Sequence, residues 1–244
     1  MAEDGLKALR TSLAERLAVL REVSADALPP ALLDLSVQRF VVGPEEVVLI
    51  LPRDWEQLRH EEGGAGRPVP YWARPWPSGL ALAGALAAPE IAGALRGARV
   101  LELGCGLAAP SVVAARAGAD VLATDGIEDA VAFAAHVLAL NEVVAEVAQV
   151  DWAAHGEALV ARGPFDVVLA ADVLYTRANV EVALTLWPRL LAPGGVLRLA
   201  DPERAGTRDF LAAARGRFDV VTTERREDGV ALHVLRPGGR SAAR

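Results

Sequence analysis

Apolar residues near the amino terminus recur at the spacing of an amphipathic helix. Over Leu6–Val23 they stand three or four residues apart, which places them on one helical face. Two runs rich in β-branched and other apolar residues follow, Val37–Val42 and Val47–Leu51. Because only a short segment containing Gly43 and Pro44 separates these runs, the pattern predicts a β-hairpin.

A segment rich in glycine and proline comes next. Glu61–Pro70 holds three glycines and two prolines, a composition that predicts a mobile loop. We therefore divide the chain into residues 1–69, a helix and hairpin expected to form a cap or docking element, and residues 70–244, expected to form the principal domain.

From Arg99 onward, short apolar runs alternate with helical patterns, which is typical of a parallel sheet with crossover helices. Glu224–Val230 is too short for a crossover helix, so the two strands that it joins should be antiparallel. The predicted fold class is α/β: a Rossmann-like seven-stranded sheet, mostly parallel with an antiparallel last strand and with helices on both faces. The predicted strands are Arg99–Leu103, Asp120–Thr124, Glu146–Val150, Asp166–Ala170, Gly195–Ala200, Phe218–Thr223 and Ala231–Leu235, and the helices lie near Pro110–Ala117, Ile127–Leu140, Asn179–Leu191 and Gly206–Arg215.

Composition narrows the class of protein. The 244 residues are 52% apolar and 23% charged, as in ordinary globular proteins. A net charge of −7 is the wrong sign for a protein that binds nucleic acid by neutralising phosphates. The chain shows no secretory signal and no uncharged run of about 20 residues that could span a membrane. We expect a cytoplasmic protein without nucleic-acid or membrane partners, and the single Cys105 agrees with a reducing compartment.

The strongest local signal is the segment Val100–Ser111, in which an apolar strand leads into a glycine turn. Gly104 and Gly106 would let a ligand approach the backbone, and Pro110 suits the first turn of the following helix. The structural alternative is a turn that only connects strand to helix.

Asp125 ends the next predicted strand, 19 residues after Gly106. A carboxylate at this distance can accept hydrogen bonds from ribose hydroxyls, and the alternative is that it caps the helix near Ile127. The glycine turn and Asp125 fit both a nicotinamide dinucleotide and S-adenosylmethionine. Glu102 favours the second ligand, because an acid two residues before Gly104 can hold the amino group of a methionine moiety.

Two further strand ends carry candidate ligand contacts. Asp151 could accept a hydrogen bond from the exocyclic amine of an adenine while Trp152 packs on its face; the alternative is a strand-end acid and a buried tryptophan. Ala171, Asp172 and Tyr175 follow another strand, where open α/β sheets bind ligands.

Aromatic residues gather around the same predicted crevice. Five of the seven Trp and Tyr residues map to loops or strand ends there, which predicts an aromatic-lined pocket: Tyr71, Trp72, Trp76, Trp152 and Tyr175. The alternative is a hydrophobic plug over the sheet edge. The four histidines are scattered, and with one cysteine neither a metal site nor a Cys–His nucleophile is predicted.

Taken together, these residues resemble the class I, seven-strand S-adenosylmethionine-dependent methyltransferases. The segments Trp76–Gly79 and Asp172–Tyr175 resemble family 16, many of whose members methylate protein lysines, and Pro70–Gly79 is most similar to the branch of the electron-transfer flavoprotein β-subunit lysine methyltransferase. The resemblance covers residues 70–200 well and the first 60 hardly at all. Where the family often has a third glycine, this chain has Ala108.

The resemblance implies S-adenosylmethionine as cofactor, S-adenosylhomocysteine as product and a protein lysine as the methyl acceptor. It implies cofactor contacts for Trp76, Gly104, Cys105, Gly106, Asp125, Trp152 and Ala171, to which the residue chemistry adds Glu102 and Asp151. Asp172 would orient the acceptor amine, and Tyr175 would wall its channel. The alternatives are a small-molecule methyltransferase, an NAD-dependent oxidoreductase and a cofactor-binding module without chemistry.

Overall fold

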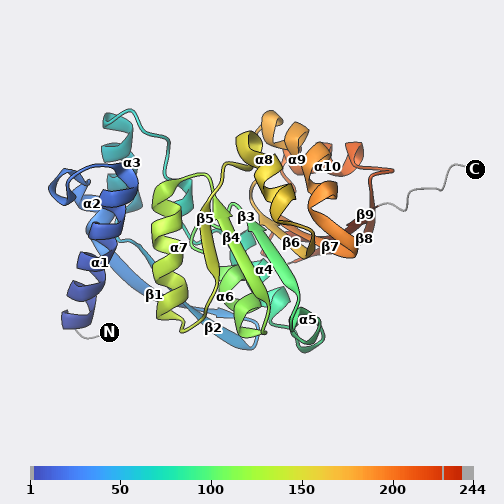
Figure 1. Ribbon diagram of the computed structural model, residues 1–244, viewed down its shortest axis with the longest axis horizontal. Coiled ribbons are helices and arrows are strands. Elements are labelled where there is room, and N and C mark those ends of the chain that lie inside the picture. The colour runs from blue at the N-terminus through green and yellow to red at the C-terminus, as the bar shows by residue number, and fades with distance from the viewer. Residues whose placement is uncertain (1–2, 227, 238–244) are drawn as a thin grey trace, which may run out of the picture.

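A seven-stranded sheet forms the centre of the computed structural model, which describes residues 3–226 and 228–237 (Figure 1). Its strand order is β5-β4-β3-β6-β7-β9-β8, and β9 runs antiparallel to both of its neighbours while the other pairs are parallel. The predicted fold class and all seven predicted strands are confirmed. The strands are β3 (Arg99–Leu103), β4 (Asp120–Asp125), β5 (Glu146–Gln149), β6 (Phe165–Ala171), β7 (Leu191–Asp201), β8 (Phe218–Arg225) and β9 (Ala231–Pro237).

Helices cover both faces of this sheet because its strands alternate their side chains between two cores. Val100 packs with α4, α6 and α7, whereas Leu101 and Leu103 face α8, α9 and α10. The helices are α1 (Glu3–Arg21), α2 (Pro30–Leu33), α3 (Trp55–Gly64), α4 (Pro77–Leu86), α5 (Pro89–Leu95), α6 (Ala109–Arg116), α7 (Glu128–Leu140), α8 (Trp152–Arg162), α9 (Arg177–Leu190) and α10 (Ala205–Ala213), with short 3₁₀ turns η1 (Ala25–Ala27) and η2 (Tyr71–Ala73).

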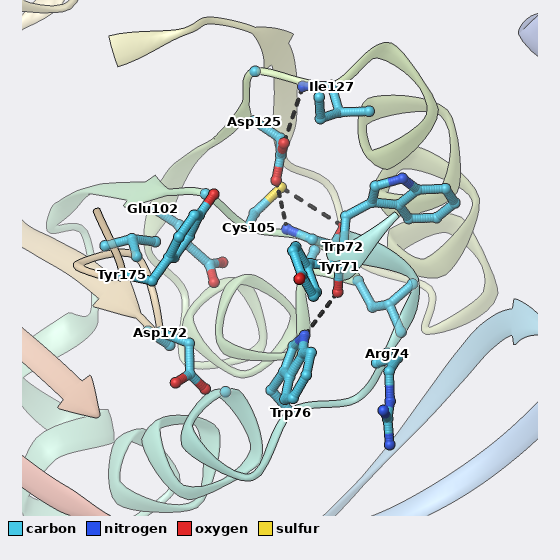
Figure 2. A pocket seen from close by; sticks show the side chains of 18 of the residues that line it. Tyr71, Trp72, Arg74, Trp76, Glu102, Cys105, Asp125, Ile127, Asp172 and Tyr175 are labelled. Carbon is cyan, nitrogen blue, oxygen red and sulfur yellow. Dashed lines mark hydrogen bonds between the residues drawn. The ribbon is translucent and has the colours of Figure 1, made fainter. Parts of the chain in front are cut away.

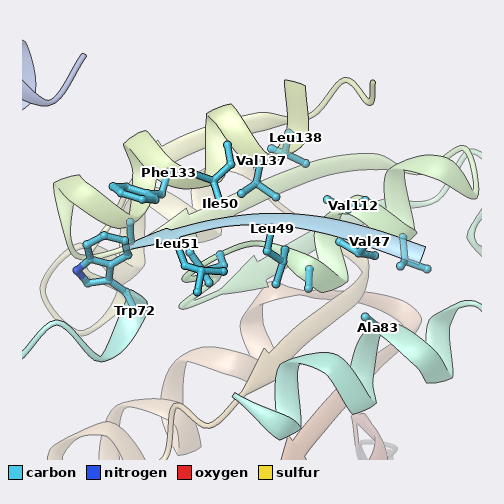
Figure 3. Packing of buried hydrophobic residues seen from close by; sticks show 14 of the residues in the cluster. Val47, Leu49, Ile50, Leu51, Trp72, Ala83, Val112, Phe133, Val137 and Leu138 are labelled. Carbon is cyan, nitrogen blue, oxygen red and sulfur yellow. The ribbon is translucent and has the colours of Figure 1, made fainter. Parts of the chain in front are cut away.

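The predicted hairpin is present as β1 (Leu35–Val42) and β2 (Glu45–Pro52), which pair in antiparallel register. Its apolar side chains pack against α6 and α7 (Figure 3). Asn141, at the end of α7, fixes this contact: its side chain accepts from the Val48 N–H at 3.0 Å and donates to the Val48 carbonyl at 2.7 Å. The hairpin therefore adds a further layer outside the helices of the sheet.

The amino-terminal helix α1 packs along α7 through Leu13 and Leu17, both fully buried. Its opposite side carries Lys7, the only lysine in the chain, in an exposed position. This division between a buried and an exposed face is what the apolar spacing in this segment predicts.

The predicted mobile loop at Glu61–Pro70 is wrong in its first part, because α3 continues to Gly64. The helix starts at a side-chain cap, Asp54, whose Oδ1 accepts from the Gln57 N–H at 3.0 Å. Glu62 in its last turn is 2% exposed and ion-paired. Burial of that side chain fixes the helix end despite two adjacent glycines, a tertiary effect that local composition does not reveal.

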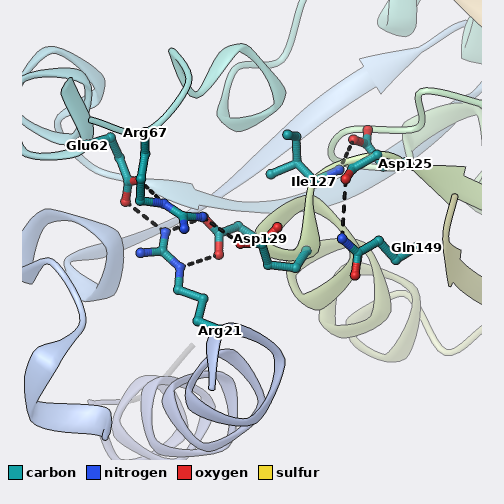
Figure 4. A network of polar contacts seen from close by, with 9 residues as sticks. Arg21, Glu62, Arg67, Asp125, Ile127, Asp129 and Gln149 are labelled. Atoms are coloured by element: carbon teal, nitrogen blue, oxygen red, sulfur yellow. Dashed lines mark hydrogen bonds and ion pairs between the residues drawn. The ribbon is translucent and has the colours of Figure 1, made fainter. Parts of the chain in front are cut away.

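A buried ion cluster joins α1, α3 and α7 (Figure 4). Arg21 Nη2 lies 2.7 Å from Glu62 Oε1, and its Nε donates to Asp129 Oδ1 at 2.7 Å. Arg67 adds contacts of 2.6 Å to both Glu62 and Glu128. Because Asp129 lies in the first turn of α7, the cluster fixes the segment that directly follows β4.

Among the described residues, no single helix has the length and apolarity to cross a membrane, although the bent pair α4 and α5 passes that test together. Both helices of the pair begin at proline, and α4 is largely buried in the core between β1 and the sheet.

Candidate active site

A cavity of about 880 Å³ opens where the carboxyl ends of β3, β4, β6 and β7 meet (Figure 2). The structure brings every residue that the sequence singled out for a cofactor or catalytic role into its lining: Trp76, Glu102, Gly104, Cys105, Gly106, Asp125, Asp151, Trp152, Ala171, Asp172 and Tyr175. The cavity has two parts. We call Glu102, Gly104, Gly106 and Asp125 the glycine-turn end, and Asp172, Tyr175 and Arg204 the Asp172 end.

Two glycines of the turn have left-handed backbones and pack closely against neighbouring protein atoms. Gly104 has φ +66°, and a Cβ there would lie 2.7 Å from Val173 Cγ1. Gly106 has φ +50°, and its Cβ would lie 3.2 Å from the Trp72 carbonyl oxygen. A larger residue would be strained at both positions, because the backbone is left-handed and each Cβ site already has close protein neighbours. The two glycines therefore keep the turn on a tight path along the cavity that they line.

Ala108, where the related family often has glycine, is fully buried and also adopts a left-handed conformation, with φ +57°. It precedes α6, and Pro110 occupies the first turn of that helix as the sequence predicts. Alanine tolerates this conformation at a cost of about 1 kcal/mol. The turn therefore keeps its shape without the third glycine.

Asp125 is 8% exposed and organises this end of the cavity. Its Oδ2 accepts from the Gly106 N–H at 2.9 Å and its Oδ1 from the Ile127 N–H at 3.0 Å. The bond to Ile127 partly realises the capping alternative, while the bond to Gly106 ties the carboxylate to the glycine turn. Each oxygen keeps a second acceptor position, which suits a diol.

Glu102 lies beneath the turn, 2% exposed. Its Oε2 accepts from the Ser111 N–H at 3.0 Å and from the Ser111 hydroxyl. Burial raises the pKa of this carboxyl to about 8. Burial also raises the pKa of the Cys105 thiol, so this cysteine remains protonated and is a packing residue of the turn.

The Asp151–Trp152 pair begins a helix, α8, that the strand pattern did not predict. Asp151 Oδ1 caps it by accepting from Ala153 N–H at 2.9 Å and Ala154 N–H at 3.3 Å. Trp152 is 8% exposed and packs on Trp187 with ring centroids 5.7 Å apart. Asp151 is therefore a helix cap and Trp152 a buried packing residue, as the structural alternative for this pair supposed. Contact of either side chain with an adenine in the cavity stays a prediction.

Aromatic rings form one wall of the cavity. Tyr71 contacts Trp55, Trp76 and Tyr175 at centroid separations between 6.3 and 6.4 Å. The Trp76 indole N–H donates to the Tyr71 carbonyl at 2.7 Å, and Arg74 lies 5.0 Å from the Trp55 and Trp76 rings. The predicted aromatic lining is present, since all five expected rings reach the cavity.

Tyr175 is 61% exposed, and its hydroxyl faces the Asp125 side of the cavity (Figure 2). Partial burial raises the pKa of this phenol, and the charge of Asp125 raises it further. Tyr175 and Tyr71 thus meet across the cavity from two separate loops.

Asp172 follows β6 in a left-handed conformation, with φ +59°. Its N–H donates to the Ala200 carbonyl at 3.0 Å, and its Oδ1 is ion-paired with Arg204. Arg204 Nη1 also lies 3.4 Å from Oδ2 of the fully buried Asp201. One guanidinium therefore serves two carboxylates at this end of the cavity, and Ala171 beside them leaves the space open.

Two residues of this lining, Arg204 and Asn179, were not predicted from the sequence. Arg204 has a recognisable signal, because it stands three residues after Asp201, the last residue of β7, at the ligand-binding edge of the sheet. Asn179 lines the cavity and donates to the Val173 carbonyl at 2.7 Å. Trp55 lies outside the lining but contacts the Tyr71 ring, and no local pattern predicts that contact.

The family comparison matches this chain over residues 95–226 to a model described as a methyltransferase domain. That segment contains the glycine turn and the whole Asp172 end. No curated protein matches the sequence.

Solved structures show the same fold. A 16S rRNA methyltransferase of T. thermophilus, in complex with S-adenosylmethionine and guanosine, has a TM-score of 0.61 at 20% identity over 88% of this chain and 52% of its own; the present chain spans about half of its length. A TehB-like S-adenosylmethionine-dependent methyltransferase of Corynebacterium glutamicum scores 0.51 at 21% identity, over 75% of this chain and 96% of its own. A ribosomal-protein methylase of Lactobacillus delbrueckii scores 0.50 at 20% identity, over 64% and 76%.

Proposed function

We propose that this protein transfers a methyl group to a lysine side chain of another protein. The chain belongs to the methyltransferase-domain family and is an S-adenosylmethionine-dependent methyltransferase. The observation that carries the proposal is that the Asp172 carboxylate lines the same cavity as the exposed tyrosine rings of Tyr71 and Tyr175. An acid and aromatic faces suit an ammonium before transfer and a methylammonium after it.

The glycine-turn end fits the methyl donor. Gly104 and Gly106 line the cavity, Asp125 keeps free acceptor positions for the ribose, and Glu102 can hold the amino group. When bound, S-adenosylmethionine supplies a methyl group on a positively charged sulfur, which accepts the electron pair of the broken carbon–sulfur bond. We place Trp76, Cys105, Asp151, Trp152 and Ala171 around the same ligand because they line the same cavity.

The protein's task is alignment and charge control, since the transfer is an in-line displacement. The acceptor nitrogen must be neutral when its lone pair attacks, so its proton leaves first, to water or to Asp172. Asp172 then orients the amine, and Tyr175 walls its path. The groups at this end supply both the attraction for a cation and the route for its proton.

Two observations favour a protein over other acceptors. Tyr71 and Tyr175 are 50% and 61% exposed, so the aromatic wall continues to the molecular surface, where a side chain can enter. The net charge of −7 opposes binding of a phosphate backbone. RNA and small-molecule acceptors are the competing outcomes. We also propose a cytoplasmic setting, which the buried free thiol of Cys105 supports.

The test is an acceptor search. A whole-cell extract from a strain lacking the protein is incubated with purified enzyme and methyl-labelled S-adenosylmethionine, and the labelled fraction is mapped by mass spectrometry. Label on a lysine Nε supports the proposal. Label confined to RNA or to small molecules overturns it.

Asp172→Asn then tests the role of this carboxylate. We expect turnover to fall about 100-fold, because the variant loses the amine's anionic partner and leaves Arg204 to repel it. Affinity for S-adenosylhomocysteine should stay within about twofold, as Asp172 lies outside the glycine-turn end. Asp166→Asn is the matched control, an exposed acid at the start of the same strand. Full turnover by Asp172→Asn would remove Asp172 from the mechanism.

A further inference from the structure

The Asp172 end holds a cation of its own. Arg204 stands in the segment between β7 and α10, and its guanidinium contacts Asp172 and Asp201 together. Its side chain is 37% exposed, whereas Asp172 is 11% exposed and Asp201 is fully buried. Two carboxylates and one guanidinium leave this group of side chains with one net negative charge.

The backbone holds this group in place. Arg204 N–H donates to Asp201 Oδ1 at 2.7 Å. Gly206 is in direct contact with the loop after β6, since a Cβ there would lie 2.0 Å from the Leu174 carbonyl oxygen. Asp172 and Glu203 both have left-handed φ angles, +59° and +57°. Such strained positions persist where the surrounding structure determines them, and they concentrate at functional sites.

The other titratable and charged groups of the cavity lie farther along its wall. Glu102, Asp125 and Asp151 stand towards the glycine-turn end, with the Cys105 thiol. Arg74 lies between the Trp55 and Trp76 rings, and the Tyr71 and Tyr175 phenols form the aromatic wall. Within the described residues, Arg204 is thus the cation in direct contact with Asp172.

We propose that Arg204 is a specificity-determining residue. It keeps the Asp172 end of the cavity at one net negative charge, so that a lysine ammonium can bind there and still lose its proton. The inference rests on the proposed lysine acceptor. Without Arg204 the Asp172 end would carry two negative charges. It would bind the ammonium more tightly, and the ammonium would keep its proton to higher pH. If the Asp172 end carried no net charge, it would bind the ammonium poorly.

The reaction itself balances without another reactant. The ammonium releases a proton to water or to Asp172, the neutral nitrogen forms a bond to the methyl carbon, and the sulfur keeps the electron pair of the broken bond. Arg204 takes part in none of these bonds. It acts through the charge that surrounds the amine.

Arg204→Gln tests this inference, with labelling rates measured from pH 6 to 9.5 on the same extract at several dilutions. An opposite or like charge within contact distance moves a pKa by one unit or more. We expect the midpoint of the pH–rate profile to rise by about one unit, the rate at pH 7 to fall about tenfold, and half-saturation to occur at a lower extract concentration. Arg204→Lys should restore the profile because it restores the charge.

Asp201→Asn provides a second variant with the opposite sign. It keeps an acceptor for the Arg204 N–H but removes one carboxylate, so the midpoint should move to lower pH. Arg225→Gln is the matched control, since it breaks the exposed Arg225–Glu203 ion pair next to the same segment. S-adenosylhomocysteine affinity and thermal stability are measured for every variant to confirm the fold.

The outcomes separate the two proposals. Label on lysine with the shifts described supports both. Label on lysine with an unmoved or downward midpoint in Arg204→Gln, or with no restoration by Arg204→Lys, overturns the role of Arg204 alone. Label confined to groups other than a lysine Nε overturns the lysine acceptor, and the inference about Arg204 with it.

Discussion

The two ends of the cavity are built in different ways. The glycine-turn end consists of backbone conformation and of buried acids that bind backbone N–H groups, so its contacts come from residues close in sequence or on neighbouring strands. The Asp172 end consists of partly exposed side chains from separate loops, joined by an ion pair and ring contacts. The glycine-turn end is therefore held by backbone geometry, whereas the charge and shape of the Asp172 end can change with single substitutions.

Asp125→Ala should have the largest effect on this contrast. It removes the acceptor of two backbone hydrogen bonds as well as the expected ribose contact, and bonds to a charged group are worth about 1.5–3 kcal/mol each. We expect affinity for S-adenosylhomocysteine, measured by calorimetry, to fall about 100-fold. Asp120→Ala is the control, an exposed acid at the start of the same strand. Unchanged affinity in Asp125→Ala would show that the glycine-turn end does not depend on this carboxylate.

Gly104→Ala should have the next largest effect and should reach both ends. The new Cβ would press on Val173, the neighbour of Asp172, so we expect about a tenfold loss of S-adenosylhomocysteine affinity together with lower turnover. Val173→Ala in the same chain should relieve the contact and recover part of both losses.

Gly194→Ala separates strain from contact in that experiment. Gly194 also has a positive φ, +78°, but nothing lies within 4 Å of its Cβ position. It should lower the free energy of unfolding by about 1 kcal/mol without changing affinity. Equal affinity losses in both glycine variants would mean that backbone strain alone, and not the crowding at Val173, accounts for the result.

Glu102→Gln should change the contrast between the two ends least, because its expected effect is on the pH dependence of stability. In the ligand-free fold the pKa of Glu102 is about 8, against an ordinary value of 4.5. The contribution of the neutral Glu102 carboxyl to the free energy of unfolding is complete below pH 4.5 and is lost as the pH rises through 8. The reason is that, between these pH values, unfolding releases the proton of this carboxyl. We expect the Tm of Glu102→Gln relative to the native chain to rise by about 10 °C between pH 5 and pH 8.

The control for this measurement is Glu90→Gln, an exposed glutamate in the first turn of α5. It should leave the Tm difference constant over the same range. A Glu102→Gln curve parallel to that of the native chain would show that this carboxyl is already ionised in the free protein.

The same contrast explains how far the sequence could be interpreted. The strands and the glycine turn follow from local rules: alternation of apolar side chains, and the need for glycine at Gly104 and Gly106. Asp125 is predictable because it ends the neighbouring strand. These contacts repeat the order of the chain, so spacing alone locates them.

The misses have tertiary causes. The end of α3 is fixed by the buried Glu62, whose partner Arg21 stands 41 residues away. Asp151 caps a helix whose first residue, Trp152, is also β-favouring, so local propensity did not separate strand from helix there. Arg204 pairs with an acid 32 residues earlier in the chain. Such pairings depend on how loops approach one another across the sheet edge.

The exposed position of Lys7 on α1 has a practical consequence for identifying the acceptor. Because the chain carries a single lysine, an enzyme with the proposed lysine acceptor could modify itself at only one lysine side chain. Any label on lysine at the mass of the enzyme would therefore report one known side chain, and Lys7→Arg would remove that background completely. Because its basic residues are almost all arginine, this protein would add very little lysine-methylation background of its own to a search of a proteome.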